Sequence, residues 1–173
     1  MNRMLKWCYI LGLVLFMQTA VFSFGVEGRT GQDSLVLVYI LLISLSLIQV
    51  GLIYWIRIYS EDRLIQFALL LTIVGIPFLM ISQFVSLLHL VGETIPEVLS
   101  IHLELTPIGA MSLLFPFGLI SFGYVLFKRY MRIGITLSIS AFVMMVGLVI
   151  TPWVHHVGII AVSVFGLILV KKL

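Results

Sequence analysis

Charged residues are scarce in this chain. Only 10% of its 173 residues are Asp, Glu, Lys or Arg, whereas 62% are hydrophobic. A soluble domain contains about 25% charged residues, and so few charges cannot cover a water-facing surface of this size. The scarcity excludes an ordinary soluble globular protein and indicates that lipid surrounds most of the chain.

Cysteine and membrane-buried charge are nearly absent as well. Cys8 is the only cysteine, so the sequence has no internal disulfide and no cysteine-based structural zinc site. No Lys, Arg, Asp or Glu falls near the middle of an apolar segment, where such residues usually mark ion or proton pathways. Nucleotide-binding glycine loops and the GxSxG hydrolase motif are also missing. These absences favour a protein that is not an enzyme.

Long apolar runs make up most of the sequence. A helix needs about 20 apolar residues to cross a hydrocarbon core of about 30 Å. Six segments reach or approach this length, at residues 5–24, 35–56, 64–90, 107–127, 133–150 and 153–170. We therefore expect one domain, residues 1–173, folded as an all-α bundle of about six transmembrane helices.

The basic residues orient this bundle. With six spans, nine of the ten share one side, and only Arg29 lies on the other; the nine are Arg3, Lys6, Arg57, Arg63, Lys128, Arg129, Arg132, Lys171 and Lys172. The positive-inside rule then predicts a multi-pass protein of the cell (cytoplasmic) membrane with both termini in the cytoplasm. Because these residues lie in short clusters and not on one basic face, nucleic acid is excluded as a partner. A cleavable signal peptide is the alternative for the first segment, but its length favours an uncleaved helix.

Small and polar residues inside the spans predict helix packing, because lipid gives apolar helices no reason to associate. Stripes of small residues occur in the third span and in the fifth span; they consist of Gly75, Ser82 and Ser86, and of Gly134, Ser138 and Ala141. Gln18, Gln49 and Gln83 should face protein, since lipid leaves an amide unsatisfied. Pro77 and Pro116 should kink the third and fourth spans.

The loop between the third and fourth spans predicts a short amphipathic helix on the outer surface. Thr94 and Glu97 have the spacing of a capping box. Leucine, isoleucine and valine cover one side of the helix that follows, and acidic residues cover the other. His102 falls on the apolar side, facing the bundle or the headgroups.

All four histidines fall on the outer side under this topology. Together with nearby carboxylates they are candidate ligands of a metal or a haem; the set is His89, His102, His155, His156, Glu93, Glu97 and Glu104. A pH-responsive cluster is a further interpretation. Independent placement of interface-tolerant histidines is the simpler one, because His155 and His156 project about 100° apart on a helix.

Three functions fit these observations. The first is a non-catalytic subunit, an accessory or scaffold protein that packs against other membrane protein subunits in a larger complex. The second is an outward-facing metal- or haem-binding redox protein that uses the histidines. The third is a small-solute carrier or its substrate-binding membrane component. In architecture alone the six short spans resemble the substrate-binding components of energy-coupling-factor vitamin transporters, but no motif carries this resemblance, so it implies no site residues.

Overall fold

The computed structural model describes residues 2–23, 31–92 and 107–172, and these ranges are almost entirely helical. The helices are α1 (Asn2–Ser23), α2 (Gly31–Ile58), α3 (Arg63–Leu90), α5 (Pro107–Ser112), α6 (Leu114–Phe127), α7 (Met131–Ile150) and α8 (Pro152–Lys172). The predicted all-α class is confirmed. The predicted outer surface helix lies in 93–106, outside the described residues.

The helices are long and apolar enough to form a multi-pass membrane protein. Five stretches qualify as membrane spans, namely 3–23, 35–58, 63–85, 107–127 and 153–172, and the apolar stretch of α7 at 131–147 is shorter. Each of the six lies within or overlaps one of the apolar segments identified in the sequence. The prediction of a bundle of about six helices is therefore confirmed.

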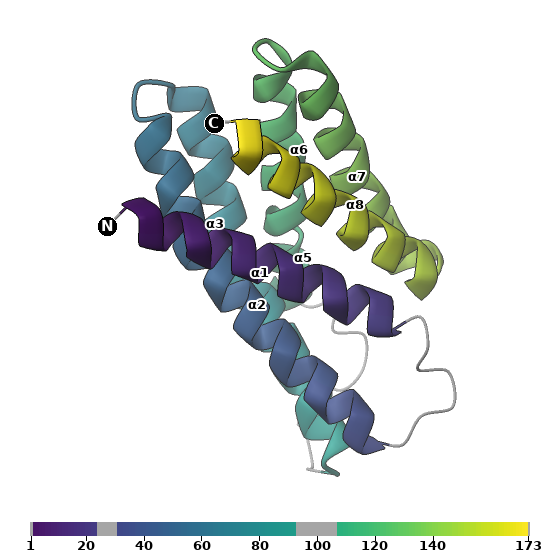
Figure 1. Cartoon of the computed structure of the whole chain (residues 1–173). Helices are drawn as coiled ribbons and strands as arrows, with labels where there is room; N and C mark the ends of the chain where they lie inside the picture. Colours follow the sequence, from purple (N-terminus) through teal and green to yellow (C-terminus); the bar gives the residue numbers. More distant parts are fainter. Residues whose placement is uncertain (1, 24–30, 93–106, 173) are drawn as a thin grey trace.

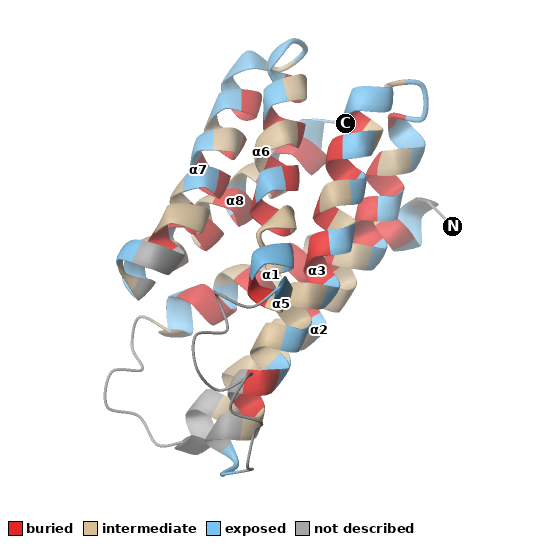
Figure 2. Ribbon diagram, turned by 180° about the vertical axis from the view of Figure 1, so that it is seen from behind, coloured by how far each residue is buried: buried red, intermediate tan, exposed pale blue. Residues whose placement is uncertain are grey.

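The six spans form a closed ring (Figure 1). Around it each helix packs against the next in the order α1, α2, α3, α6, α7, α8, and α8 packs back against α1. Buried residues lie on the faces that the helices turn towards one another, and exposed residues lie on the outside (Figure 2). Large rings meet across the middle: Phe16 of α1 is 6.3 Å from Phe115 of α6, and Trp55 of α2 is 6.1 Å from Phe122 of α6. Aromatic side chains thus fill the space between helices that are not neighbours in the ring.

One end of the ring carries the basic residues, and we call it the basic end. The start of α1, the end of α8, the α2–α3 turn and the α6–α7 turn all lie there (Figure 1). The nine basic residues that the sequence assigns to one side occupy these helix ends and turns. Both ends of the described chain therefore share a side, as the charge pattern predicts.

Proline divides the fourth span. α5 ends at Ser112 and α6 begins at Leu114, two residues before Pro116. Because Pro116 has no N–H to donate to the carbonyl of Ser112, the helix is interrupted here. Leu113 donates instead to the carbonyl of Ala110, at 3.2 Å. Pro77, by contrast, lies inside a continuous α3.

Candidate functional site

The outer-side histidines that the structure describes lie near the start of α8. Their rings are 5.8 Å apart, and Nδ1 of His155 is 2.7 Å from the carbonyl oxygen of Met144 on α7. Since a carbonyl only accepts hydrogen bonds, this nitrogen carries the proton and Nε2 keeps its lone pair. Metal-ligating histidines use this arrangement, and so do histidines that simply satisfy their own polar atoms in a core.

The remaining predicted ligands are not brought to this place by the described part of the chain. His89 is in the last turn of α3, with its side chain outside the described set, and His102, Glu93, Glu97 and Glu104 all lie outside the described residues. The end of α3 and the start of α8 occupy separate corners of the ring (Figure 1). Among the described residues no three His, Cys, Asp or Glu side chains come together as metal ligands would. A site made of all the outer histidines therefore stays a prediction.

Three of the six small residues predicted to pack helices lie at close crossings inside the ring. A Cβ on Gly75 would overlap the backbone nitrogen of Phe115 on α6, and a Cβ on Gly134 would lie 2.5 Å from the carbonyl oxygen of Gly123. Ser138 donates its hydroxyl to the carbonyl of Ile120, at 2.9 Å. The other three members are a buried Ala141, a half-buried Ser82 and a Ser86 whose side chain lies outside the described set.

These crossings join helices of the same chain. Gly12 and Gly51 bring α1 against α2, Gly118 brings α6 against α3, and Gly147 and Gly158 bring α7 against α8. Gly75, Gly134 and Ser138 thus lie between neighbouring helices of this bundle. They do not form an outward-facing surface.

An outward-facing surface runs along α1. Its outward side, the open face of α1, consists of Met4, Trp7, Leu11, Gln18, Val21 and Phe22, all of them exposed. Gln18 is the one polar residue in this apolar stripe, and its amide makes no hydrogen bond to any described residue. Within this chain Gln18 does not face protein, so the prediction that it does is not met by the bundle itself. Tyr9, Leu13 and Phe16 set the rotation of α1 by turning inward, and Gln18 falls about 200° from Phe16.

The other two intramembrane glutamines behave differently. Gln49 of α2 is half-buried, and its amide nitrogen lies 3.5 Å from the carbonyl oxygen of Ile73 on α3, within hydrogen-bonding range. Gln83 of α3 is also half-buried. Of the three, Gln18 alone is exposed on the outside of the ring.

An aromatic cluster lies at the basic end. Trp55 is fully buried, stacks on Tyr59 at 6.2 Å, and meets Tyr9 edge-on at 5.7 Å. Phe122 of α6 contacts both Trp55 and Tyr59. The indole N–H of Trp55 and the hydroxyl of Tyr59 are buried without a hydrogen-bond partner among the described residues. The cluster joins α1, α2 and α6 at the basic end of the ring.

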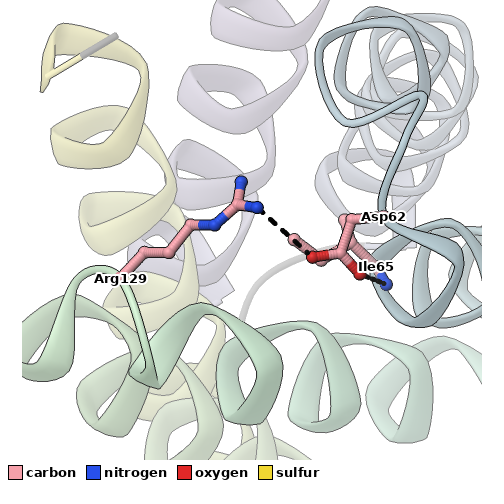
Figure 3. A network of polar contacts seen from close by, with 3 residues as sticks. All are labelled: Asp62, Ile65 and Arg129. Atoms are coloured by element: carbon pink, nitrogen blue, oxygen red, sulfur yellow. Dashed lines mark hydrogen bonds and ion pairs between the residues drawn. The ribbon is translucent and has the colours of Figure 1, made fainter.

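Two turns meet above this cluster (Figure 3). A guanidinium nitrogen of Arg129, from the α6–α7 turn, is 3.6 Å from a carboxylate oxygen of Asp62 in the α2–α3 turn. The other oxygen of Asp62 accepts the backbone N–H of Ile65, at 3.2 Å, and so caps the first turn of α3. Arg129 also lies over the ring of Tyr59, 5.6 Å from its centroid, within the range of a cation–π interaction.

A hollow of about 280 Å³ opens between these turns. Its lining is Ile58, Tyr59, Ser60, Glu61, Asp62 and Arg129. Burial raises the pKa of the Tyr59 phenol above its usual value, with smaller contributions in the same direction from Tyr130 and Asp62, while Arg129 opposes them. Tyr59 therefore stays a neutral hydroxyl at physiological pH.

Sequence reasoning did not single out this hollow. It used Arg129 only as one of the nine basic residues that orient the bundle. One signal was present: Glu61 and Asp62 are the two acidic residues on a side otherwise occupied by nine basic ones. Two adjacent acidic residues on a side that is otherwise basic are the feature from which a specific contact could have been predicted.

Comparison with known proteins adds no relative to this description. No family model, curated protein or solved structure matches the chain.

Proposed function

We propose that this chain is a non-catalytic integral membrane subunit that binds another membrane protein through the open face of α1. The occupant we propose is a transmembrane helix of a different protein that presents an amide or hydroxyl to Gln18. The observation that carries the proposal is the exposed amide of Gln18 in an otherwise apolar stripe.

The position of this amide supports a partner. Gln18 lies about 7 Å along the axis from the end of α1 at Ser23, too far inside for a short side chain to reach the headgroups easily. A polar group without a hydrogen bond in hydrocarbon is strongly disfavoured. A hydrogen bond between helices in the membrane contributes about 1–2 kcal/mol in model peptides and about 0.6 kcal/mol on average in a protein. A glutamine, which both donates and accepts, fits another amide or a hydroxyl.

The interior of the ring supports a scaffold more than a carrier. Trp55, Phe115 and Phe122 are at most 2% exposed. Across the middle of the bundle Trp55 meets Phe122, and Phe115 meets Phe16. The described interior is thus packed with large apolar side chains, where a solute pathway needs polar groups lining a cavity. The carrier and the metal or haem protein remain alternatives without a described site of their own.

Site-specific cross-linking in native membranes tests the proposal. In a Cys8→Ala background, Leu11→Cys places one thiol on the open face of α1, and Phe142→Cys places one on the exposed side of α7 as a matched control. We expect Leu11→Cys, and not Phe142→Cys, to form a cross-linked species larger than the monomer. Gln18→Leu should abolish that species and Gln18→Asn should restore it, because asparagine keeps the amide.

Three results would count against this function. A cross-linked species that survives Gln18→Leu would show that the amide is irrelevant to the contact. A species of twice the monomer mass would identify a second copy of this chain as the occupant. A monomer that purifies alone in mild detergent and forms no cross-link from Leu11→Cys would leave the open face to lipid.

A further inference from the structure

We infer that the hollow between the α2–α3 and α6–α7 turns binds the headgroup of an amine-bearing phospholipid, of the phosphatidylethanolamine type. This inference is independent of the proposed partner on α1, because the hollow is lined by the end of α2, the α2–α3 turn and Arg129 of the α6–α7 turn.

The first argument is location. Basic residues in short turns mark the side of a membrane protein that faces the cytoplasmic headgroups. The hollow lies at the basic end, where α2 ends and the turn to α3 begins. Its volume of about 280 Å³ is below the range of about 300–1,000 Å³ that holds drug-sized ligands, which suits a compact headgroup.

The second argument is charge. The lining holds the carboxylates of Glu61 and Asp62 and the guanidinium of Arg129, which leaves one net negative charge. Exposed cations flank it at the adjoining helix ends, namely Arg57, Arg63, Lys128 and Arg132. A ligand that places an ammonium inside and a phosphate at the rim satisfies both regions.

The third argument is that the internal ion pair leaves capacity for a ligand. The 3.6 Å between Arg129 and Asp62 exceeds the roughly 2.7–2.9 Å of a strong charge-assisted hydrogen bond. The side chain of Arg129 is 56% exposed and that of Asp62 is 25% exposed. The carboxylate oxygen that faces Arg129 and the outer N–H groups of the guanidinium can therefore accept and donate further hydrogen bonds.

These features select among headgroups. A primary ammonium donates three hydrogen bonds to carboxylates such as those of Glu61 and Asp62. The quaternary ammonium of phosphatidylcholine donates none, and phosphatidylglycerol would bring a headgroup without a cation against two carboxylates. We expect the order of binding to be phosphatidylethanolamine first, with the other two clearly weaker.

Native mass spectrometry of the delipidated full chain measures this directly. The probes are dioleoyl phosphatidylethanolamine, phosphatidylcholine and phosphatidylglycerol, which share the same acyl chains. We expect one tightly retained phosphatidylethanolamine, bound about tenfold more strongly than either competitor, since hydrogen bonds to charged groups account for a difference of that order. Equal retention of the three lipids, or a preference for phosphatidylglycerol, would overturn the inference.

Matched variants locate the site. Asp62→Asn removes the charge but keeps an N-cap residue for α3, so the fold should persist while phosphatidylethanolamine retention falls to the level of phosphatidylcholine. Glu61→Gln should weaken retention in the same direction, and Lys171→Gln, a basic-end residue that does not line the hollow, should leave it unchanged. A folded Asp62→Asn protein that retains the lipid like the parent would refute the assignment. Binding of water-soluble phosphoethanolamine without retention of the lipid would refute the lipid as its source.

Discussion

Gly75→Ala tests the packing of the ring most directly, because it adds a single methyl group at the crossing of α3 and α6. That methyl would overlap the backbone nitrogen of Phe115 and lie 2.8 Å from its Cα. Ordinary van der Waals contact begins near 3.4 Å. Backbone atoms cannot rotate away as a side chain can, so α3 and α6 must move apart.

The cost follows from the weaker dispersion between two helices that have separated. Thr72, Ile76 and Phe115 are at most 2% exposed at this crossing. A gap of about 0.5–1 Å forfeits about a quarter to a half of each dispersion contact of about 0.1–0.2 kcal/mol. Over about 20–30 atom pairs this amounts to about 0.5–3 kcal/mol, while alanine regains up to about 1 kcal/mol as the better helix former. We expect the free energy of unfolding to fall by about 1–2 kcal/mol.

Gly166→Ala is the matched control, since it makes the same chemical change in α8. Its added methyl would lie 2.7 Å from Cδ1 of Leu13, the far end of a flexible side chain that can shift. The gain in helix propensity then dominates, and we expect stability to stay the same or rise by up to about 1 kcal/mol.

Reversible unfolding in mixed micelles, followed by far-ultraviolet circular dichroism as the denaturing detergent is increased, compares the two variants with the parent. The reasoning requires Gly75→Ala to be less stable than Gly166→Ala by about 2 kcal/mol, because dispersion weakens where α3 crosses α6 and persists where α8 crosses α1. Equal stabilities, or a more stable Gly75→Ala, would show that α3 and α6 do not approach as closely as described.

Three further predictions concern single polar groups. Ser138→Ala removes the hydrogen bond to the Ile120 carbonyl and should lower the free energy of unfolding by about 0.6–1 kcal/mol in the same unfolding assay. The neutral Tyr59 phenol stabilises the fold fully below the unfolded pKa of about 10, and this contribution is lost as pH rises through the higher folded pKa. Tyr59→Phe should therefore lose less stability than the parent in thermal melts between pH 9 and pH 12, and identical alkaline profiles would contradict the burial of this hydroxyl. His155→Ala leaves the Met144 carbonyl without its side-chain donor and should cost about 1 kcal/mol, with an unchanged visible spectrum if the ring only packs; loss of a chromophore would instead restore the haem alternative.

The helices themselves could be predicted closely from the sequence. A bilayer requires about 20 apolar residues per span, and the polar or proline-containing links between the runs mark where each helix stops. The apolar segment at 64–90, for example, becomes α3 at Arg63–Leu90. Even the interruption of the fourth span follows from Pro116, although the sequence indicates a kink and the structure has a break at Leu113.

Lateral arrangement could not be predicted in the same way. The charge pattern gives each loop a side of the membrane, but it does not say which loops on that side are neighbours. Asp62 meets Arg129 only because α3 packs against α6. The rotation of α1 about its axis could not be predicted from the position of its polar residue. Tyr9 and Phe16 pack inward, and this places Gln18 on the outside.

Closure of the ring by α1 and α8 has a consequence for biosynthesis. The ribosome makes α1 long before α8, the neighbour that holds one of its flanks through Gly166 against Leu13. During translation the nascent chain therefore remains an open arc in the membrane, and the ring cannot close until α8 has been inserted. A premature stop codon before Pro152 would remove α8, so the ring could not close. We expect membrane quality-control proteases to degrade such a truncated chain.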